Sequence, residues 1–433
     1  MKQLLQKIQD RSARVVVVGI GYVGLPLVVE FARSGFQVVG YDKDRDKVRL
    51  LGLGESYIGD IPSATLKPLV DKGLLRASSD PDVLGAADAI VVCVPTPLNK
   101  TKDPDMRFIA SASDEIAEHQ HPGMVVVLES TTYPGTTREV LVPKLTRGKY
   151  ELGKDVFVAF SPERVDPGNQ TYFVRNTPKV LGGATPACLE VAQSLYSTII
   201  DTVVPVSSTD AAEMVKLLEN TFRAVNIGLV NEIALMSRRL GIDVWEVIRA
   251  AASKPFGFMP FFPGPGLGGH CIPIDPLYLS WRMRTLKYQA RFIELADTIN
   301  SSMPEHVVVL TQQALNDAGK AAKGSKVLVA GVAYKKDVSD YRESPAFDIL
   351  HGLATLGAEV SYLDPHVPEV DEGGVVMRSL PRNTSFADFD AVVVVTNHAA
   401  FDYERMLREA KIVVDTRDAL RSVPGDKSRV VRL

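Results

Sequence analysis

The sequence predicts an α/β fold of two Rossmann-like, doubly wound domains joined by a helical middle domain with a long central helix. Strand-length apolar runs alternate with helix-length stretches in the first part of the chain, and the same alternation returns in the last third. Between the two, no strand is needed and the apolar residues recur at helical spacing. We therefore expect domains at residues 1–208, 209–306 and 307–433.

The first βαβ unit lies near the N-terminus. Residues 14–18 form a β-branched run, a helical pattern extends from Val23 to Ser34, and a second strand covers residues 37–41. Further strands are expected at 89–94, 125–129 and 156–160, separated by stretches long enough for helices. This order is typical of a parallel sheet covered by helices on both faces.

The middle of the chain is predicted to be helical. Apolar residues at helical spacing run from Thr209 to Leu240, a helical segment continues to Ala252, and another helix is expected from Pro276 to about Asn300.

The last third repeats the opening plan. Strands are expected within 326–334, 359–363, 391–398 and 411–418, and a helix from Ser344 to Leu356. Two such domains would suit an enzyme that holds two nucleotide-containing ligands, because open α/β sheets bind ligands at the carboxyl ends of their strands.

Composition excludes several classes of function. The net charge of −3, from 49 basic and 52 acidic residues, favours neither a nucleic-acid nor a membrane partner. Three widely spaced cysteines form no zinc or disulfide pattern, so no metal is expected. The first residues lack the apolar core of a signal peptide, and the longest apolar runs are of strand length. We expect a cytoplasmic protein.

A G-x-G-x-x-G sequence follows the first strand and opens the first helix. In such a loop the glycines serve a tight turn, close approach of a pyrophosphate to the backbone, and packing of the helix on the sheet. The phosphates then bind the N–H groups at the helix N-terminus. The residues expected at this cofactor site are Gly19, Gly21, Tyr22, Val23 and Gly24.

Asp42, at the end of the second strand, stands where an acid would bind the adenosine ribose hydroxyls. A carboxylate there should repel a 2′-phosphate, which favours NAD over NADP. Lys43 and Arg45 lie close enough in sequence to weaken this preference.

Residues 256–276 form a Gly- and Pro-rich loop that contains Cys271. Cys271 lies just before a predicted helix, whose N-terminus would stabilise the reactive thiolate. Asp275 could hydrogen-bond a reacting oxygen or a water, or it could cap the helix. Cys93, inside an apolar strand, and Cys188 are interpreted as small buried hydrophobes.

Five segments in this order resemble the signature segments of the UDP-glucose/GDP-mannose dehydrogenase family. They are STTYPGTT (130–137), SPERVDPGN (161–169), EMVKLLENTFRAVNIGLVNE (213–232), GPGLGGHCIPIDP (264–276) and GVAYKKDVSDYRESPA (331–346). The resemblance implies an NAD-dependent, four-electron oxidation of a UDP-sugar CH2OH group to the acid, with Cys271 carrying a thiohemiacetal and then a thioester.

The resemblance also assigns catalytic roles. Lys216 and Asn220, four residues apart on one helix face, would stabilise the alkoxide and the oxyanion, although such a face can also be merely solvated. Glu163 would perform acid–base work on the hydrolytic water, which Thr131 and Asp275 would orient. Asp166 stands close enough to Glu163 to be an alternative.

Ligand contacts follow from the same resemblance. Tyr334 would stack on the base and Lys335 would contact phosphate or ribose, although Lys335 and Lys336 could equally be surface charges. Arg342 would reach into the site between the domains and contribute to cofactor binding. Pro95, Thr96 and Thr131 are further expected cofactor contacts. The expected substrate contacts are Glu163, Arg164, Val165, Lys216, Asn220, Phe262, Gly266, Tyr334 and Lys335.

The motifs around 161–169 and 256–276 are most similar to the branch of the family that acts on UDP-N-acetylglucosamine. Ile274 occupies a position that is usually Lys in the UDP-glucose branch, which argues against UDP-glucose without excluding it as an alternative. UDP-N-acetylmannosamine and UDP-N-acetylgalactosamine stay open as substrates.

Two other classes compete with this interpretation. One is a two-electron dehydrogenase of the 6-phosphogluconate type, which would need neither the cysteine nor a third domain. The other is a nucleotide-sensing protein without turnover, against which the presence of Cys271, Lys216 and Asn220 argues. The apolar surface of the long helix exceeds what one core requires, so a homodimer through the middle domain is expected.

Overall fold

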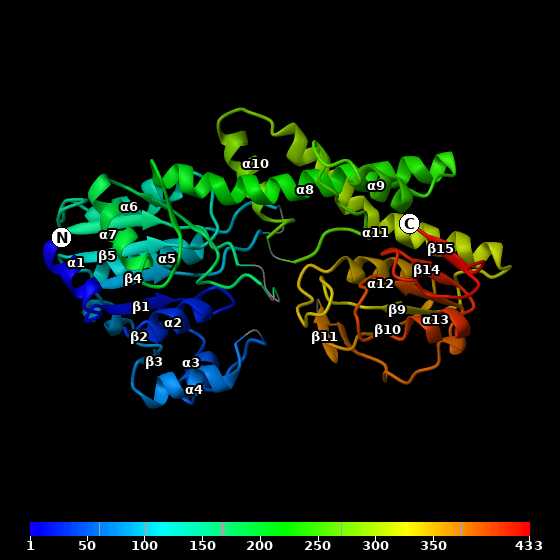
Figure 1. The fold of residues 1–433 in the computed structure, drawn as a ribbon, viewed down its shortest axis with the longest axis horizontal. Helices are drawn as coiled ribbons and strands as arrows, with labels where there is room; N and C mark the ends of the chain where they lie inside the picture. Colours follow the sequence, from blue (N-terminus) through cyan, green and yellow to red (C-terminus); the bar gives the residue numbers. More distant parts are fainter. Residues whose placement is uncertain (60, 100–101, 166–168, 170, 270, 373–374) are drawn as a thin grey trace. The chain divides into compact units, whose positions relative to one another are not determined.

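The computed structural model describes residues 1–433 except 60, 100–101, 166–168, 170, 270 and 373–374. The chain forms two compact units, coloured by sequence in Figure 1. Unit 1 comprises Met1–Glu219 and Leu277–Tyr288, and unit 2 comprises Asn220–Pro276 and Gln289–Leu433. Helix α8 (Thr209–Leu240), which contributes residues to both units, has the extent that its periodicity predicts.

Unit 1 is built on an eight-stranded sheet with the order β3-β2-β1-β4-β5-β6-β7-β8. The first six strands have the order of a dinucleotide-binding Rossmann sheet and are parallel, whereas β7 runs antiparallel to β6. The strands are β1 (Arg14–Val18), β2 (Gln37–Tyr41), β3 (Leu75–Ser78), β4 (Ala89–Val92), β5 (Met124–Leu128), β6 (Val156–Phe160), β7 (Lys179–Gly183) and β8 (Val203–Val206).

Helices cover both faces of this sheet. Side chains alternate along β1, so Val15 and Val17 join one apolar cluster while Val16 and Val18 join another. The first cluster includes α1 (Lys2–Gln9), α2 (Gly24–Arg33), α4 (Ser63–Asp71) and α7 (Pro186–Tyr196). The second includes η1 (Pro81–Ala86), α5 (Arg107–His119), η2 (Thr137–Leu141) and α6 (Val142–Thr146). Helix α3 (Arg45–Gly52) follows β2.

Unit 2 contains a five-stranded parallel sheet with the order β10-β9-β13-β14-β15, a doubly wound order. Its strands are β9 (Lys326–Ala330), β10 (Glu359–Leu363), β13 (Ala391–Val394), β14 (Val413–Asp415) and β15 (Val430–Arg432). A separate hairpin pairs β11 (Glu369–Glu372) with β12 (Val375–Arg378).

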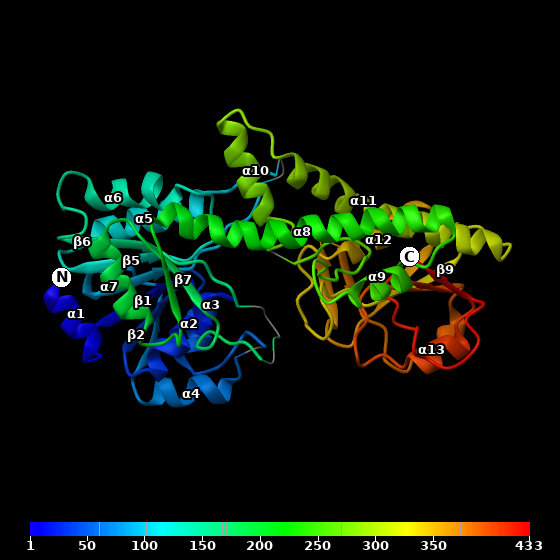
Figure 2. The ribbon, with the colours of Figure 1, turned by 45° about the horizontal axis from the view of Figure 1, so that its top comes forward.

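The helices of unit 2 lie on both faces of its sheet. Helices α11 (Arg291–Asp317) and α12 (Pro345–Thr355) lie next to each other (Figure 2). Their apolar side chains form one cluster with those of the sheet. The opposite face packs against α13 (Tyr403–Glu409) and η3 (Phe386–Asp388). Helix α9 (Val244–Ala252) follows α8. The second α/β fold that the sequence predicts is confirmed.

One predicted helix is wrong. The segment expected to run as a single helix from Pro276 to about Asn300 forms α10 (Asp275–Thr285) and then α11, which continues past Pro304. The chain turns between them, where Lys287 adopts a left-handed φ of 59°. Neither Gly nor Pro marks residues 286–290, so the break gives no turn signal in the sequence. Among the helices of the described residues, none has the length and apolar character needed to cross a bilayer.

Candidate active site

The first glycine loop has the backbone that dinucleotide binding requires. Gly19 has a φ of 89°, and a Cβ there would lie 2.5 Å from the carbonyl oxygen of Cys93. A Cβ on Gly24 would lie 1.9 Å from the carbonyl oxygen of Gly19, so the helix can begin there only without a side chain. A Cβ on Gly21 would meet no protein atom within 4 Å. The space beside Gly21 therefore suits a pyrophosphate that approaches the backbone.

The neighbouring residues of the loop lead into helix α2. Val23 precedes its first residue, the N–H of Leu25 donates to the carbonyl of Gly21 at 3.0 Å, and Tyr22 is exposed. The dipole of the helix N-terminus favours an anion at this end. Pro95 and Thr96 follow strand β4, with Thr96 buried and Pro95 exposed. The donor set of this loop fits the pyrophosphate of a dinucleotide.

Asp42 lies at the carboxyl end of β2 and is tied to the glycine loop. Its Oδ2 accepts the N–H of Ile20 at 3.0 Å, and its Oδ1 accepts the N–H of Asp44 at 2.9 Å. Lys43 pairs instead with Glu115 at 2.5 Å, and Lys47 is 3.8 Å from Asp42. Lys43 is therefore directed away from Asp42, whereas Lys47 forms a long ion pair with it.

The 130–137 loop is fixed by a buried carboxylate. Glu213 of α8 accepts the N–H groups of Gly135 at 2.6 Å and Thr137 at 2.8 Å. Burial raises the pKa of Glu213 to about 7, against the opposing effect of these donors. One turn further along α8, the Nζ of Lys216 donates to the Oγ1 of Thr131 at 2.6 Å. Two predicted catalytic residues are thus in direct contact.

Glu163 follows β6 and has a nearly buried side chain. Its Oε1 accepts the N–H groups of Arg164 at 2.8 Å and Val165 at 2.7 Å. Burial alone would raise the pKa of Glu163, but the charge of Lys179, the two N–H donors and the charge of Lys216 together lower it. Arg164 itself pairs with Glu219 at 2.6 Å, and Asp166 lies outside the described residues.

A buried ionic cluster behind Glu163 was not predicted. Lys179, the first residue of β7, places its Nζ 2.9 Å from Glu129 and 3.4 Å from Glu163. The hydroxyl of Tyr196 donates to the other oxygen of Glu129. Burial raises the pKa of Glu129 to about 7 although Lys179 opposes this. The position of Glu129 at the carboxyl end of a parallel strand is a signal that sequence reasoning could have used.

The three thiols have different environments. Cys271 is exposed, whereas Cys93 and Cys188 are buried. Burial, with the charges of Glu129 and Glu163, raises the pKa of Cys93 well above its ordinary value. Accessibility therefore singles out Cys271 as the thiol that a substrate can reach.

Cys271 lies just before helix α10 (Asp275–Thr285). Its carbonyl accepts the N–H of Asp275 at 2.9 Å, so it lies one turn before the first residue of that helix. The buried carboxylate of Asp275 accepts the side-chain N–H of Asn220 at 2.6 Å. The structure therefore joins the predicted residues Asn220, Asp275 and Cys271 into one connected set.

The glycines before Cys271 pack on Tyr334. A Cβ on Gly268 would lie 2.8 Å from the Cβ of Tyr334, and a Cβ on Gly269 would lie 2.7 Å from its ring. The N–H of Gly269 also donates to the carbonyl of Arg342 at 3.1 Å. Thus only glycine fits between the cysteine loop and the loop that carries Tyr334, Lys335 and Arg342. The guanidinium of Arg342 is paired with Asp340 at 2.7 Å.

The earlier part of the cysteine loop is anchored to the helices. The buried Asn231 of α8 accepts the N–H of Gly264 at 2.9 Å and donates to Asn300 of α11 at 2.9 Å. Phe262 stacks on Trp245, with ring centroids 5.9 Å apart. Gly266 has a φ of 131°, which favours glycine.

Arg417, which follows β14, was not among the predicted site residues. A Cβ on Gly264 would lie 2.5 Å from its guanidinium, so Arg417 borders the cysteine loop. Its Nε donates to the carbonyl of Val395 at 2.8 Å, and burial lowers its pKa to about 10. The signal was present as an arginine directly after a parallel strand.

The loop after β9 is held by a histidine. His398 accepts the N–H of Asp337 at its Nδ1, 2.9 Å away, and its Nε2 is 3.0 Å from Asp364. His366 completes a group of His and Asp side chains within 4.8 Å of one another. Since both nitrogens of His398 are engaged, this group acts as a hydrogen-bond network that supports the loop carrying Tyr334 and Lys335.

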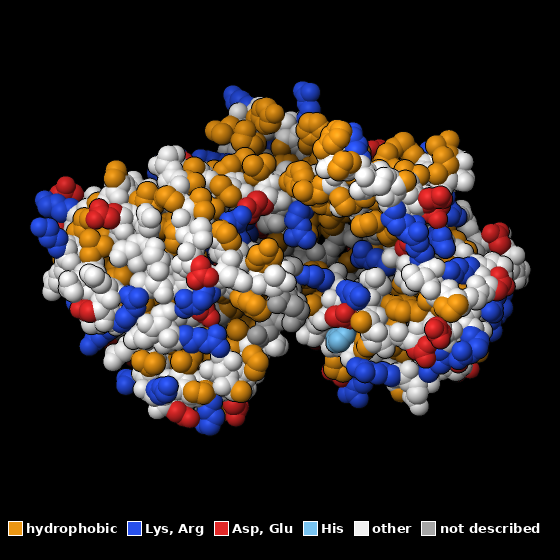
Figure 3. Space-filling view, in the orientation of Figure 1, with side chains coloured by type: hydrophobic (Ala, Val, Ile, Leu, Met, Phe, Trp, Pro, Cys, Tyr) orange, Lys and Arg blue, Asp and Glu red, His pale blue; other side chains and the backbone are white. Residues whose placement is uncertain are grey.

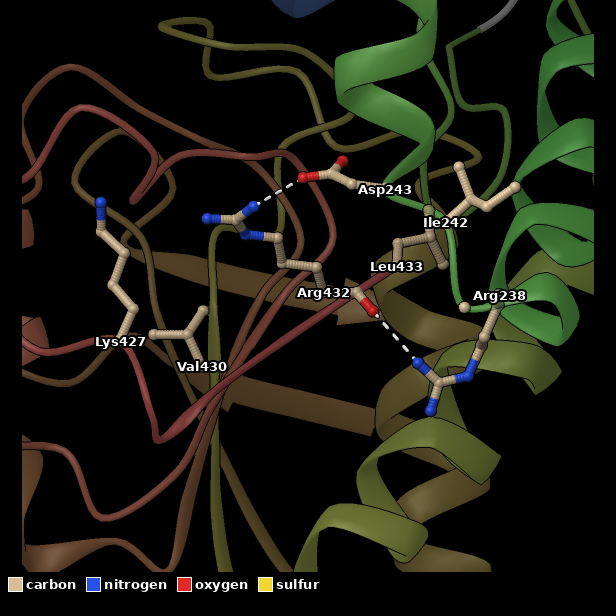
Figure 4. A pocket seen from close by; sticks show the side chains of 8 residues that line it. Arg238, Ile242, Asp243, Lys427, Val430, Arg432 and Leu433 are labelled. Atoms are coloured by element: carbon tan, nitrogen blue, oxygen red, sulfur yellow. Dashed lines mark hydrogen bonds and ion pairs between the residues drawn. The ribbon is translucent and has the colours of Figure 1, made fainter.

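A cavity of about 400 Å³ lies elsewhere in unit 2, beside the C-terminal end of α8 (Figure 4). Its lining includes Arg432, which pairs with Asp243 at 2.9 Å, and Arg238, which donates to the carbonyl of Arg432 at 3.3 Å. The predicted site residues are not among those that line it. This cavity is separate from the candidate active site.

Comparisons with known proteins give one consistent result. Three profiles of the UDP-glucose/GDP-mannose dehydrogenase family match in chain order: the NAD binding domain over residues 13–200, the central domain over 210–302 and the UDP binding domain over 328–422. The chain is 35% identical to UDP-N-acetyl-D-glucosamine 6-dehydrogenase of Pseudomonas aeruginosa, covering 90% of this chain and 92% of that one.

A second group of relatives carries a different name. The chain is 34% identical to UDP-N-acetyl-D-mannosamine dehydrogenase of Pyrococcus horikoshii, covering 95% of this chain and 97% of that protein. A solved structure described as UDP-D-ManNAc dehydrogenase from the same organism superposes with a TM-score of 0.87 at 32% identity, covering 97% of this chain and 98% of that one.

Proposed function

The chain belongs to the UDP-glucose/GDP-mannose dehydrogenase family and is an NAD-dependent UDP-sugar 6-dehydrogenase, and we propose that its substrate is UDP-N-acetylglucosamine. The C6 primary alcohol would be oxidised to the uronic acid with two NAD and one water. The three family segments in order, with the exposed Cys271 inside the central one, are the observation that carries this proposal.

When bound, NAD would supply the hydride acceptor for each of the two oxidations. We propose that its pyrophosphate rests against Gly21 and the N-terminus of α2, where a Cβ on Gly21 would meet no protein atom within 4 Å and the helix dipole favours an anion. Asp42 would bind the adenosine ribose, with Pro95, Thr96 and Thr131 as further contacts. Arg342, whose guanidinium pairs with Asp340, is proposed as a further contact to the cofactor.

Cys271 would hold the sugar between the two oxidations. Its thiolate adds to the carbonyl carbon of the aldehyde and forms a C–S bond, which gives a thiohemiacetal that does not diffuse away. Loss of hydride from that carbon then gives a thioester. Water attacks the thioester, the C–S bond breaks, and the carboxylate and the free thiol result.

The polar residues would stabilise charge where it develops. Lys216 and Asn220 are proposed donors to the alkoxide and the oxyanion, and removal of one such donor typically costs about 10²–10³ in kcat. Glu163 would take a proton from the water that attacks the thioester. Thr131 and Asp275, which contact Lys216 and Asn220 respectively, would orient that water.

The UDP portion would bind in the last third of the chain. Tyr334, Lys335 and the loop from Phe262 to Gly266 are proposed contacts, together with Arg164 and Val165 beside Glu163. Arg417 joins this set because its guanidinium borders Gly264 and is suited to a diphosphate.

UDP-N-acetylglucosamine is preferred among the candidates on the residues of two segments. The FGFMPFFPGPGLGGHCIPIDP loop and Ile274 differ from the pattern expected for UDP-glucose. Relatives named for UDP-N-acetylglucosamine and for UDP-N-acetylmannosamine are about equally similar, so UDP-N-acetylmannosamine is the main alternative.

A homodimer through α8 and α11 is part of the proposal. In unit 2 these helices pack so closely that a Cβ on Gly228 would lie 3.2 Å from Ala296. Their outer side carries exposed apolar side chains, which Figure 3 shows gathered over the helices. They are Phe222, Leu229 and Met236 on α8, seven residues apart, and Phe292 and Leu295 on α11. Leu229→Arg should give a monomer in light scattering; a dimer that persists would argue against this face.

The covalent role of Cys271 is testable with a matched thiol. Cys271→Ala should abolish acid formation but keep NAD binding, whereas Cys188→Ala, which alters a buried thiol, should keep both. Intact-protein mass measured during turnover should show an adduct on the wild type and none on Cys271→Ala. Acid formation by Cys271→Ala would remove the cysteine from the mechanism.

A further inference from the structure

Lys179 is a buried cation between two carboxylates. Its side chain is 5% exposed and those of Glu129 and Glu163 are 0% and 10% exposed. The ammonium also lies 5.4 Å from the centroid of the Tyr196 ring. Burial of so many charges is costly unless each is paired, so the arrangement needs a reason beyond stability.

The two carboxylates use Lys179 differently. Glu129 is held at both oxygens, by Lys179 on one and by the hydroxyl of Tyr196 on the other. Glu163 gives its Oε1 to the N–H groups of Arg164 and Val165, and its Oε2 meets Lys179 at the longer distance of 3.4 Å. The Oε2 of Glu163 is therefore the less firmly bound of these acceptors. It is the oxygen better able to exchange a partner for a water.

We propose that Lys179, itself held by Glu129 and Tyr196, is a positioning residue that keeps Glu163 ionised and oriented to take a proton from the hydrolytic water. The inference rests on the proposed function, because it concerns the thioester step. Lys179 contacts neither substrate nor cofactor in this scheme and acts only through Glu163.

The proton balance of that step is complete. The water gives one proton to the Oε2 of Glu163 while its oxygen forms a bond to the thioester carbon. The C–S bond then breaks, the electron pair returns to Cys271 as thiolate, and the product leaves as the carboxylic acid, which gives the second proton of the water to solvent. Glu163 releases its proton to solvent before the next turnover, and no electron is transferred in this step.

The groups that act on Glu163 come from several elements. Lys179 of β7 and Lys216 of α8 favour its charged form, whereas the buried Glu129 after β5 opposes it. The thiol of Cys93 after β4 is close enough to feel the same charges. Removal of Lys179 therefore leaves Lys216 as the remaining cation among these described residues. We expect Glu163 to hold its proton to a higher pH in that variant.

The test is the pH dependence of thioester hydrolysis, followed as loss of the Cys271 adduct by intact-protein mass. In the wild type the rate of hydrolysis should rise with pH on the acidic side of the profile, and we call this part of the profile the acid limb. Lys179→Met should move the acid limb to higher pH by at least about one unit. Hydrolysis would then be about tenfold slower at the low-pH end of the wild-type limb and would recover at high pH. Lys179→Arg keeps the charge and should leave the limb in place. Glu129→Gln removes the competing carboxylate and should leave the limb in place or move it downward.

Different failures are distinguishable. If Lys179→Met hydrolyses the thioester slowly but its acid limb has not moved, Lys179 has only a structural role. An upward shift of the acid limb in Glu129→Gln equal to that in Lys179→Met would refute the charge argument. If Lys179→Met does not fold, the Glu129→Gln/Lys179→Met double variant removes both charges. Its acid limb should also move upward, by less than in Lys179→Met because the opposing carboxylate is removed as well, and a limb that moves downward would contradict the proposal. A wild type that forms one NADH per sugar and no adduct would instead overturn the proposed function.

Discussion

Two glycines in the cofactor loop should separate binding from folding. At Gly21 a methyl group would meet no protein atom within 4 Å, whereas at Gly24 it would lie 1.9 Å from the carbonyl oxygen of Gly19. Gly21→Ala should therefore leave the free energy of unfolding within about 0.5 kcal/mol of the wild type. It should still weaken the binding of NAD, because the methyl group occupies the space into which we place the pyrophosphate.

The magnitudes follow from the two environments. A backbone contact of 1.9 Å cannot be relieved by rotation of a side chain, so Gly24→Ala should cost about 3 kcal/mol, the upper part of the range for overpacking. For a unit of this size that corresponds to a fall in Tm of about 6–12 °C. For Gly21→Ala we expect an increase in the Kd for NAD of about tenfold or more, which is about 1.4 kcal/mol or more.

The assays are thermal unfolding without ligand and titration of NAD by calorimetry on the same preparations. Gly21→Ala should change the Kd but not the Tm, and Gly24→Ala should lower the Tm. Normal NAD affinity in a stable Gly21→Ala would refute the placement of the pyrophosphate. A Gly24→Ala protein as stable as the wild type would refute the steric argument.

Three further changes test other parts of the account. Asp42→Ala should raise the Kd for NAD about tenfold and increase the ratio of activity with NADP to activity with NAD. A wild type that prefers NADP would contradict the assignment of Asp42 to the adenosine ribose. Burial raises the pKa of Glu213 from 4.5 to about 7. Its contribution to the free energy of unfolding is therefore present below pH 4.5 and is lost as the pH rises through 7. Glu213→Gln should abolish this pH dependence, measured by urea unfolding at a series of pH values. Asn231→Leu leaves the Gly264 N–H unpaired and should cost about 1–3 kcal/mol in unfolding free energy, whereas Asn226→Leu on the same helix should cost much less.

The regular elements were predictable because their periodicity is local. The strands Gln37–Tyr41 and Glu359–Leu363 and the helix Thr209–Leu240 have the bounds that the apolar pattern indicates. Strands β7 and β8 were not predicted, since two glycines end β7 and a proline interrupts β8, and β7 lies antiparallel to β6 after a run of parallel strands. The break before α11 depends on a left-handed Lys287, a conformation that has no sequence signature.

The candidate site was predictable where one segment carries both the geometry and the chemistry. The glycine loop and the cysteine loop are of this kind. Lys179 lies 50 residues from Glu129 in sequence, and a lysine at the start of a strand is usually exposed. Only the order of the sheet brings them together, so their pairing could not be derived from spacing. Arg417 follows a parallel strand, which the sequence does indicate, but its approach to Gly264 depends on the fold and could not be derived from spacing.

The number of NADH formed per molecule of sugar tests the central claim most directly. UDP-N-acetylglucosamine, UDP-N-acetylmannosamine, UDP-N-acetylgalactosamine and UDP-glucose would be compared at limiting amounts, with NADH followed by absorbance and the product identified by mass. The account predicts two NADH and one uronic acid per sugar, with the highest kcat/KM for UDP-N-acetylglucosamine. One NADH per sugar with an aldehyde product would contradict the four-electron mechanism, and a higher kcat/KM for another sugar would contradict the proposed substrate.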